Sequence, residues 1–204
     1  PKAVQTLANC ILERIPEDRK LSKMWQPRDD EGYVQRVIAI EDVPLEQGTW
    51  LVLGRTHSKL ESLKDNLKER GIYYEYKNRK SYRQRLFRNI LNYTRWTNGD
   101  KLSLTECKDL FEFLELEWVQ TEERLYGLEE FGFSFTNNWY EVFKSDPEES
   151  LYIRQMLSNG EKLNDTARVK LSTIHAAKGG EADNVLLILD NTKKIREAVE
   201  KNQD

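Results

Sequence analysis

The chain has 204 residues, of which 33% are charged and 38% are hydrophobic. This length suits one medium-sized domain, or one domain that carries an insertion. No run approaches 18 consecutive apolar residues and no secretory signal opens the chain, so we expect no membrane association. Two cysteines and two histidines exclude a disulfide scaffold, argue against a structural zinc site and favour a reducing compartment.

Charge is unevenly distributed along the chain, although the net charge is only −3. Residues 77–95 hold seven basic side chains and no acidic one, whereas residues 106–149 hold thirteen acidic and three basic ones. A basic segment beside an acidic one could bind a polyanion on one face and repel it from the other. Both segments are equally typical of solvated helix faces, and charge alone leaves the two interpretations open.

The first forty residues predict a helix, a loop and a strand. Apolar side chains recur at helical spacing from Val4 to Ile15, and Pro16 ends the pattern. Residues 17–31 are polar and read as a loop. Residues 33–40 are rich in β-branched and aromatic side chains, so we expect a strand there.

Residues 50–76 predict a strand, a helix and a second strand. A short apolar run at residues 50–53 is typical of a buried strand, and residues 58–70 carry three leucines on one helical face. Gly71 stands where a helix C-cap glycine belongs, and residues 72–76 read as the next strand. This order predicts a parallel sheet.

Residues 82–160 interrupt that order with helices. One amphipathic helix is expected near residues 86–94, a second after a capping box formed by Ser103 and Glu106, and a third over residues 148–158. Many aromatic residues lie between 118 and 143. We interpret them as the core of a small helical subdomain rather than a base-stacking platform, because the surrounding charge is acidic.

The strand and helix order then resumes, with strands expected at residues 168–173 and 185–189 and a helix at residues 192–201. The predicted fold class is therefore α/β, with a parallel-sheet lobe built from residues 1–82 and 165–204. Residues 83–164 form a mostly helical acidic insertion in this interpretation.

The run VKLSTIHAAKGGEADNV at residues 169–185 carries most of the polar chemistry. A strand ends in threonine, histidine, lysine, two glycines and glutamate, and ligands of α/β sheets gather at the carboxyl ends of strands. Glycines there allow the backbone to approach a phosphate closely. A plain polar loop with a glycine turn is the alternative that these residues leave open.

This run resembles motif V of the UvrD/Rep-like superfamily 1 DNA helicases, whose pattern is close to T-x-H-x-x-K-G-x-E. The five matching positions are Thr173, His175, Lys178, Gly179 and Glu181. The segment LVLGRT at residues 51–56, with its helix and the following GIYYEY, is similar to motif IV of that family. The resemblance covers nearly the whole chain, except that residues 83–165 match only as an insertion in the expected place.

The resemblance implies a RecA-like lobe of the P-loop NTPase type, the second of two lobes that hold ATP and Mg²⁺ between them. Arg55 would be the catalytic residue that contacts the γ-phosphate, and Glu181 would hold the ribose. Gly179 and Lys178 would also serve the nucleotide, although Lys178 could contact DNA instead.

The same resemblance implies that Thr173 and His175 contact the backbone of single-stranded DNA. The whole protein would be an ATP-dependent helicase that translocates on one strand and unwinds duplex. Its partners would be single-stranded DNA, duplex junctions and its own N-terminal RecA-like lobe, in the cytoplasm of a bacterium or a phage-infected host. His57 follows motif IV without a role that the resemblance supplies.

Two positions depart from the family pattern. Gly54 stands where many members have an aromatic residue that stacks on adenine, and Gly180 replaces the usual leucine. The insertion is shorter than in the best-known members, as in phage-type helicases.

Walker A and Walker B sequences do not occur, and motif VI would follow after Asp204. We therefore expect a fragment that is inactive alone and whose metal ligands lie elsewhere in the protein. The alternative is a non-catalytic RecA-like module that binds DNA or docks another protein.

Overall fold

The structure is a computed structural model that describes residues 1–20, 26, 28–132 and 138–189. The chain divides into two compact units, Pro1–Pro44 and Leu45–Asp204, and each is described by itself. The helix predicted for residues 192–201 lies outside the described residues.

The first unit is built around helix α1 (Lys2–Leu12) and two short 3₁₀ turns, η1 (Glu17–Arg19) and η2 (Ile40–Asp42). The backbone N–H groups of Lys2 and Ala3 donate to the carbonyls of Asp30 and Glu31, which returns the chain to the start of the helix. The predicted helix is confirmed, but it ends three residues before Ile15.

The strand predicted for residues 33–40 is wrong. No strand is assigned anywhere in the described part of the first unit, and Tyr33 and Ile38 are 71% and 100% exposed. β-Branched and aromatic side chains favour a strand only where a neighbouring strand and a half-buried surface receive them. This segment has neither among the described residues, so its composition alone does not produce a strand.

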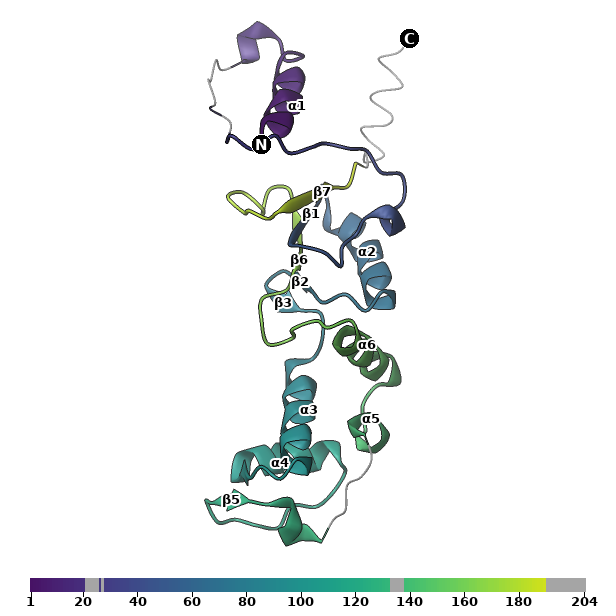
Figure 1. Ribbon diagram of the computed structural model, residues 1–204, viewed down its shortest axis with the longest axis vertical. Coiled ribbons are helices and arrows are strands. Elements are labelled where there is room, and N and C mark those ends of the chain that lie inside the picture. The colour runs from purple at the N-terminus through teal and green to yellow at the C-terminus, as the bar shows by residue number, and fades with distance from the viewer. Residues whose placement is uncertain (21–25, 27, 133–137, 190–204) are drawn as a thin grey trace. The chain divides into compact units, whose positions relative to one another are not determined.

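The second unit contains a five-stranded sheet with the order β3-β2-β6-β1-β7 (Figure 1). Its strands are β1 (Trp50–Gly54), β2 (Tyr74–Tyr76), β3 (Arg79–Lys80), β6 (Val169–Thr173) and β7 (Asn184–Leu187). All neighbouring pairs are parallel except β2 with β3. The fold is therefore α/β with a mostly parallel central sheet, as the sequence predicts.

Helix α2 (His57–Glu69) connects β1 to β2 and covers one face of the sheet. Its three predicted leucines are buried: Leu60, Leu63 and Leu67. Gly71 follows with φ +63°, the left-handed conformation that the C-cap prediction requires. On the opposite face, Val185 and Leu187 of β7 remain 58% and 46% exposed.

The remaining elements form the segment between β3 and β6. They are α3 (Gln84–Thr97), β4 (Leu102–Ser103), α4 (Leu104–Phe113), β5 (Leu125–Tyr126), η3 (Leu128–Phe131), α5 (Trp139–Val142) and α6 (Pro147–Ser158). The predicted capping box is confirmed, since the Glu106 N–H donates to the Ser103 hydroxyl and the Glu106 carboxylate accepts from the Ser103 N–H. The pairing of β4 with β5 was not predicted.

The aromatic residues of this segment pack on one another. Ring contacts of 4.8–6.1 Å join five of them: Trp96, Phe111, Trp118, Tyr126 and Phe131. Trp96 and Tyr126 are fully buried, and the indole N–H donates to the Tyr126 carbonyl. These rings therefore form a small core, as the sequence predicts.

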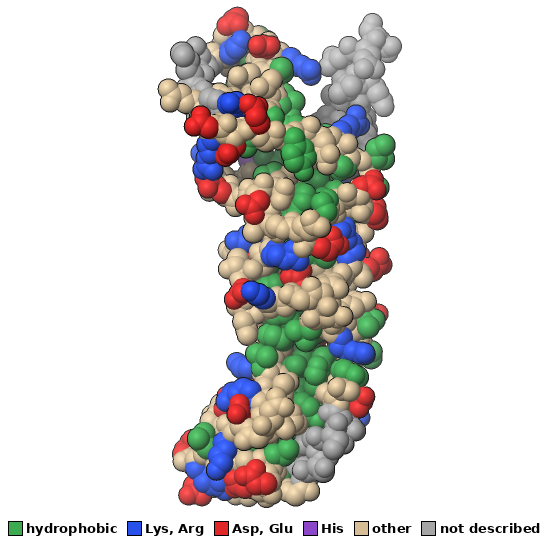
Figure 2. Space-filling model, in the orientation of Figure 1, with side chains coloured by type: hydrophobic (Ala, Val, Ile, Leu, Met, Phe, Trp, Pro, Cys, Tyr) green, Lys and Arg blue, Asp and Glu red, His purple; other side chains and the backbone are tan. Residues whose placement is uncertain are grey.

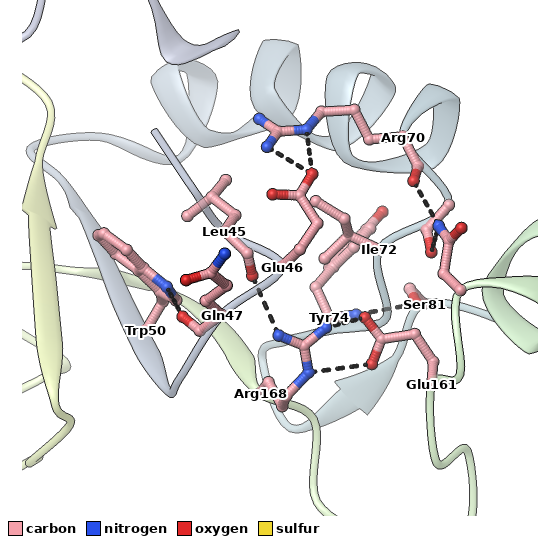
Figure 3. A network of polar contacts seen from close by, with 12 residues as sticks. Leu45, Glu46, Gln47, Trp50, Arg70, Ile72, Tyr74, Ser81, Glu161 and Arg168 are labelled. Carbon is pink, nitrogen blue, oxygen red and sulfur yellow. Dashed lines mark hydrogen bonds and ion pairs between the residues drawn. The ribbon is translucent and has the colours of Figure 1, made fainter. Parts of the chain in front are cut away.

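Polar contacts join α6 and the residues after it to the sheet. The Tyr152 hydroxyl donates to the Ile72 carbonyl at 2.7 Å, and the Asn159 amide donates to the Arg70 and Gly71 carbonyls. Arg168, just before β6, pairs with the buried carboxylate of Glu161 (Figure 3). A buried carboxylate is costly unless it is paired, so Glu161 holds Arg168 in place. Because Arg168 directly precedes Val169, this ion pair positions the start of β6.

Candidate functional site

The turns that follow β1, β2 and β6 lie at the same edge of the sheet, because these three strands are parallel neighbours. A pocket of about 420 Å³ opens there and extends along the sheet to Leu51 and Lys170, near the starts of β1 and β6. It is lined by strand residues and turn residues: Leu51, His57, Glu75, Tyr76, Lys77, Asn78, Lys170, Leu171, Ser172, Thr173, Ala176, Ala177, Lys178, Gly179 and Gly180.

Local hydrogen bonds fold the loop after β6 into successive turns. The Ala177 N–H donates to the Thr173 carbonyl at 3.0 Å, and the Ala176 N–H donates to the Thr173 hydroxyl at 3.3 Å. The Gly180 N–H then donates to the Ala177 carbonyl at 2.8 Å. Gly179 has φ +82°, which a residue with a side chain rarely adopts, so the glycine is required by the backbone itself.

Three of the six predicted site residues come together in this pocket. Thr173, Lys178 and Gly179 line it, and the Lys178 side chain is exposed. The other three are exposed but lie outside the lining: Arg55, His175 and Glu181. The structure therefore groups the predicted residues differently from their expected division into a nucleotide set and a DNA set.

Gly54 is fixed by packing against α2. A Cβ at this position would lie 3.1 Å from both Cγ and Cδ2 of Leu60, which is tighter than ordinary van der Waals contact. Leu60 is fully buried between helix and sheet, where close packing resists its displacement. A side chain at residue 54 would therefore have to displace Leu60, and Gly54 itself offers no ring to stack on adenine.

His57 also lines the pocket, although the family resemblance supplies no role for it. It is the first residue of α2, and its Nδ1 lies 2.7 Å from the Tyr76 hydroxyl at the end of β2. The two rings meet edge to face with centroids 5.8 Å apart. Burial raises the pKa of Tyr76, and the nearby Glu61 carboxylate raises it further. The position of His57 directly after a predicted strand end was the signal that could have found it.

A two-residue turn joins β2 to β3 and was also not foreseen. Lys77 and Asn78 have φ of 52° and 58°, so both adopt the left-handed conformation of a tight hairpin turn. Such turns favour glycine, and the strained backbone conformation holds both residues over the pocket. The Lys77 ammonium also lies 5.1 Å from the centre of the Tyr76 ring.

Four of the five arginines of the basic segment are paired with carboxylates. Arg85 contacts Asp109 and Glu112, and Arg88 also contacts Asp109. Arg83 pairs with Glu149 and Arg95 with Glu106 in the same way. Positive and negative side chains accordingly lie side by side around α4, at the bottom of the view (Figure 2).

These contacts lower the pKa of Asp109. Burial raises it, but hydrogen bonds from Arg85, Arg88 and Asn89 outweigh burial and bring the value down to about 2. The basic and acidic segments therefore largely neutralise each other where α3 meets α4, which favours the structural interpretation of the arginines over a polyanion surface.

No group of three or more His, Cys, Asp or Glu side chains gathers as a metal site within the described residues. None of the helices in the described ranges is long and apolar enough to cross a bilayer. Comparison with protein families, with curated proteins and with solved structures finds no match for this chain.

Proposed function

We propose that the chain is the second RecA-like lobe of an ATP-dependent DNA helicase of the UvrD/Rep-like group. One observation carries the proposal. Of the five residues that match motif V, Thr173 ends β6, the middle strand of the sheet, and the other four follow it; three of the five line a pocket at the carboxyl edge. Ligand sites of parallel α/β sheets lie at this edge.

In this proposal single-stranded DNA is held by its backbone. The Thr173 hydroxyl and the His175 imidazole can donate to phosphate oxygens without reading bases, as a motor that moves along any sequence requires. His175 is exposed and Thr173 is half-buried. Both lie within three residues of the end of β6, so movement of that strand would carry them together.

The nucleotide would receive two polar contacts from this chain. Arg55 is exposed directly after β1, and a guanidinium suits a phosphoryl group because it is always charged and donates in a fork. The exposed Glu181 carboxylate can accept hydrogen bonds from ribose hydroxyls. Gly179 and Lys178 would approach the nucleotide from the pocket side.

The donor set fits part of a nucleotide site and not the whole of one. The described residues include no carboxylate cluster for Mg²⁺, and Gly54 offers no stacking ring. The remaining phosphate and metal contacts would come from a partner lobe of the same protein. When bound between the lobes, ATP with Mg²⁺ would supply the phosphoryl-transfer chemistry, and this chain would contribute charge stabilisation through Arg55.

The test is ATP hydrolysis by the natural protein that contains this chain, with Arg55→Ala compared with Arg79→Ala. Both arginines are exposed. Arg55 directly follows β1, and Arg79 directly follows the turn between β2 and β3 of the same sheet. We expect Arg55→Ala to lower kcat by about 100-fold or more while single-stranded DNA binding persists. Arg79→Ala should leave kcat unchanged. An unchanged kcat in Arg55→Ala would contradict the assignment.

A non-catalytic RecA-like module is the second candidate, and the closed packing at Gly54 favours it. Such a module would bind DNA or a protein and hydrolyse nothing. Its signature would be single-stranded DNA binding that is retained, with no DNA-stimulated ATP hydrolysis, in the natural protein.

A further inference from the structure

The pocket at the carboxyl edge holds an excess of positive charge. Its lining includes the ammonium groups of Lys77, Lys170 and Lys178, against one carboxylate, that of Glu75. None of these lysines forms an ion pair with a carboxylate among the residues that the structure describes. All three side chains of this group are therefore available to an anion.

The basic side chains of residues 77–95 fall into two groups in the structure. Four of the arginines are bound by carboxylates near α3 and α4, whereas Lys77 faces the pocket from the turn between β2 and β3. The positive φ of Lys77 and Asn78 places both residues of the turn in the lining. The sequence shows only that the segment is basic. In the structure, the four paired arginines are engaged with carboxylates, whereas Lys77 can still contact a ligand.

The neutral groups of the pocket also suit phosphate oxygens. Thr173 brings a hydroxyl and Asn78 brings an amide, both able to donate hydrogen bonds, whereas the Ser172 hydroxyl already donates to the Thr173 carbonyl at 3.2 Å. Arg55 and Glu181, which the proposed function assigns to the nucleotide, lie outside the lining. Thr173, which it assigns to DNA, lies inside. Gly179, which it assigns to the nucleotide, also lies inside, whereas His175, which it assigns to DNA, lies outside. The lining therefore places Lys178 beside contacts of both kinds, and its exposed ammonium suits a phosphate of either ligand.

We propose that this pocket binds the phosphate backbone of single-stranded nucleic acid through Lys77 and Lys170, with Lys178 as a third contact. This inference rests on the proposed function and adds two residues outside the family motifs. Lysine ammonium groups contact phosphates as point charges and read no sequence. A strand held there would pass the turn after β2 and run along β6, from Lys170 near its start to Thr173 at its end.

The experiment measures binding of a fluorescent oligothymidylate to the 204-residue chain by anisotropy, over a range of salt concentrations. Lys77→Ala and Lys170→Ala should each weaken binding by about threefold or more at low salt. Each should also reduce the slope of log affinity against log salt by about 0.7, the loss of one phosphate contact on a single strand. Lys77→Arg should retain the affinity of the parent chain.

Arg79→Ala is the matched control, because Arg79 is an exposed cation of the same hairpin that does not line the pocket. It should change affinity less than twofold. Lys77 and Lys170 are exposed, so we expect neither substitution to unfold the chain. Circular dichroism checks that each variant is folded before its binding is compared.

Three outcomes would overturn the inference. If Thr173→Ala weakens binding but both lysine variants behave as Arg79→Ala does, the strand lies elsewhere and the proposed function stands. If inorganic tripolyphosphate displaces the oligonucleotide as effectively as unlabelled oligothymidylate per phosphate, the pocket is a polyphosphate site. If the parent chain does not bind the oligonucleotide even at low salt, this inference and the DNA-binding role of the lobe both fail.

Discussion

The Tyr76 hydroxyl and Nδ1 of His57 lie 2.7 Å apart, and this contact joins the end of β2 to the start of α2. Because β6 lies between β1 and β2 in the sheet, the contact links the two turns that flank the end of β6. It therefore sets the spacing of the turns on either side of Thr173.

Replacing Tyr76 by Phe removes this hydrogen bond while keeping the ring. We expect the free energy of unfolding to fall by about 1 kcal/mol, the usual net contribution of one such bond. Urea denaturation measures it. Tyr33→Phe is the control, since Tyr33 is 71% exposed. Equal midpoints for the two variants would mean that the contact contributes no stability.

Gly71 and Gly160 both have positive φ, but only Gly71 is enclosed. A Cβ on Gly71 would lie 2.7 Å from Cβ of Gln155 in α6, whereas a Cβ on Gly160 would meet nothing within 4 Å. Gly160→Ala should cost about 1 kcal/mol from backbone strain alone. Gly71→Ala should cost about 1–3 kcal/mol more, because α6 must shift. Thermal unfolding compares the two variants directly. Equal losses of stability would show that α6 can shift without cost.

Asp109→Asn should destabilise the chain in a pH-dependent way. The pKa of Asp109 is lowered from its ordinary value of 3.8 to about 2, so the folded state favours the ionised carboxylate. The stabilisation is present above pH 4 and is lost as the pH falls toward 2.

At pH 7 the Asp109→Asn variant should be less stable by about 1–3 kcal/mol, the range for hydrogen bonds to a charged group. The difference should shrink below pH 4. Glu112→Gln, at a carboxylate that is 68% exposed, should change stability less than Asp109→Asn does, because solvent screens its ion pair. A difference for Asp109→Asn that stays constant from pH 7 to pH 3 would contradict the role of its charge.

The two cysteines should react with a thiol reagent at different rates. Cys10 is exposed, whereas Cys107 is fully buried in α4, and burial raises the pKa of its thiol to about 12. Since the thiolate is the reactive form, one thiol should react promptly in the native chain and the second only after denaturation. Cys10→Ser should abolish the fast phase. Two fast phases would show that the core around α4 opens readily.

Features set by local chemistry could be predicted from the sequence. The leucine spacing of α2, the left-handed Gly71 and the capping box of Ser103 all depend on neighbouring residues, and the structure contains each of them. The strand predicted for residues 33–40 failed for the opposite reason. Strand formation depends on a partner that the local composition does not supply.

Features set by contacts between distant residues could not be predicted in this way. The pairing of the arginines with Asp109 and Glu112, and the meeting of His57 with Tyr76, follow from how the elements pack. The turn at Lys77 and Asn78 lacks the glycine that normally marks such a turn. The predicted domain boundaries at residues 82 and 165 and the roles of Arg55, His175 and Glu181 stay predictions.

The place of β6 in the middle of the sheet has a consequence for synthesis on the ribosome. β1, α2 and β2 emerge first, but their two strands do not touch, and the strand that joins them follows roughly ninety residues later. At about 5–20 residues per second, the inner edges of β1 and β2 stay unpaired for on the order of 5–20 s. The nascent chain therefore depends on the intervening helices folding early, or on a chaperone, to keep these edges from pairing with other chains.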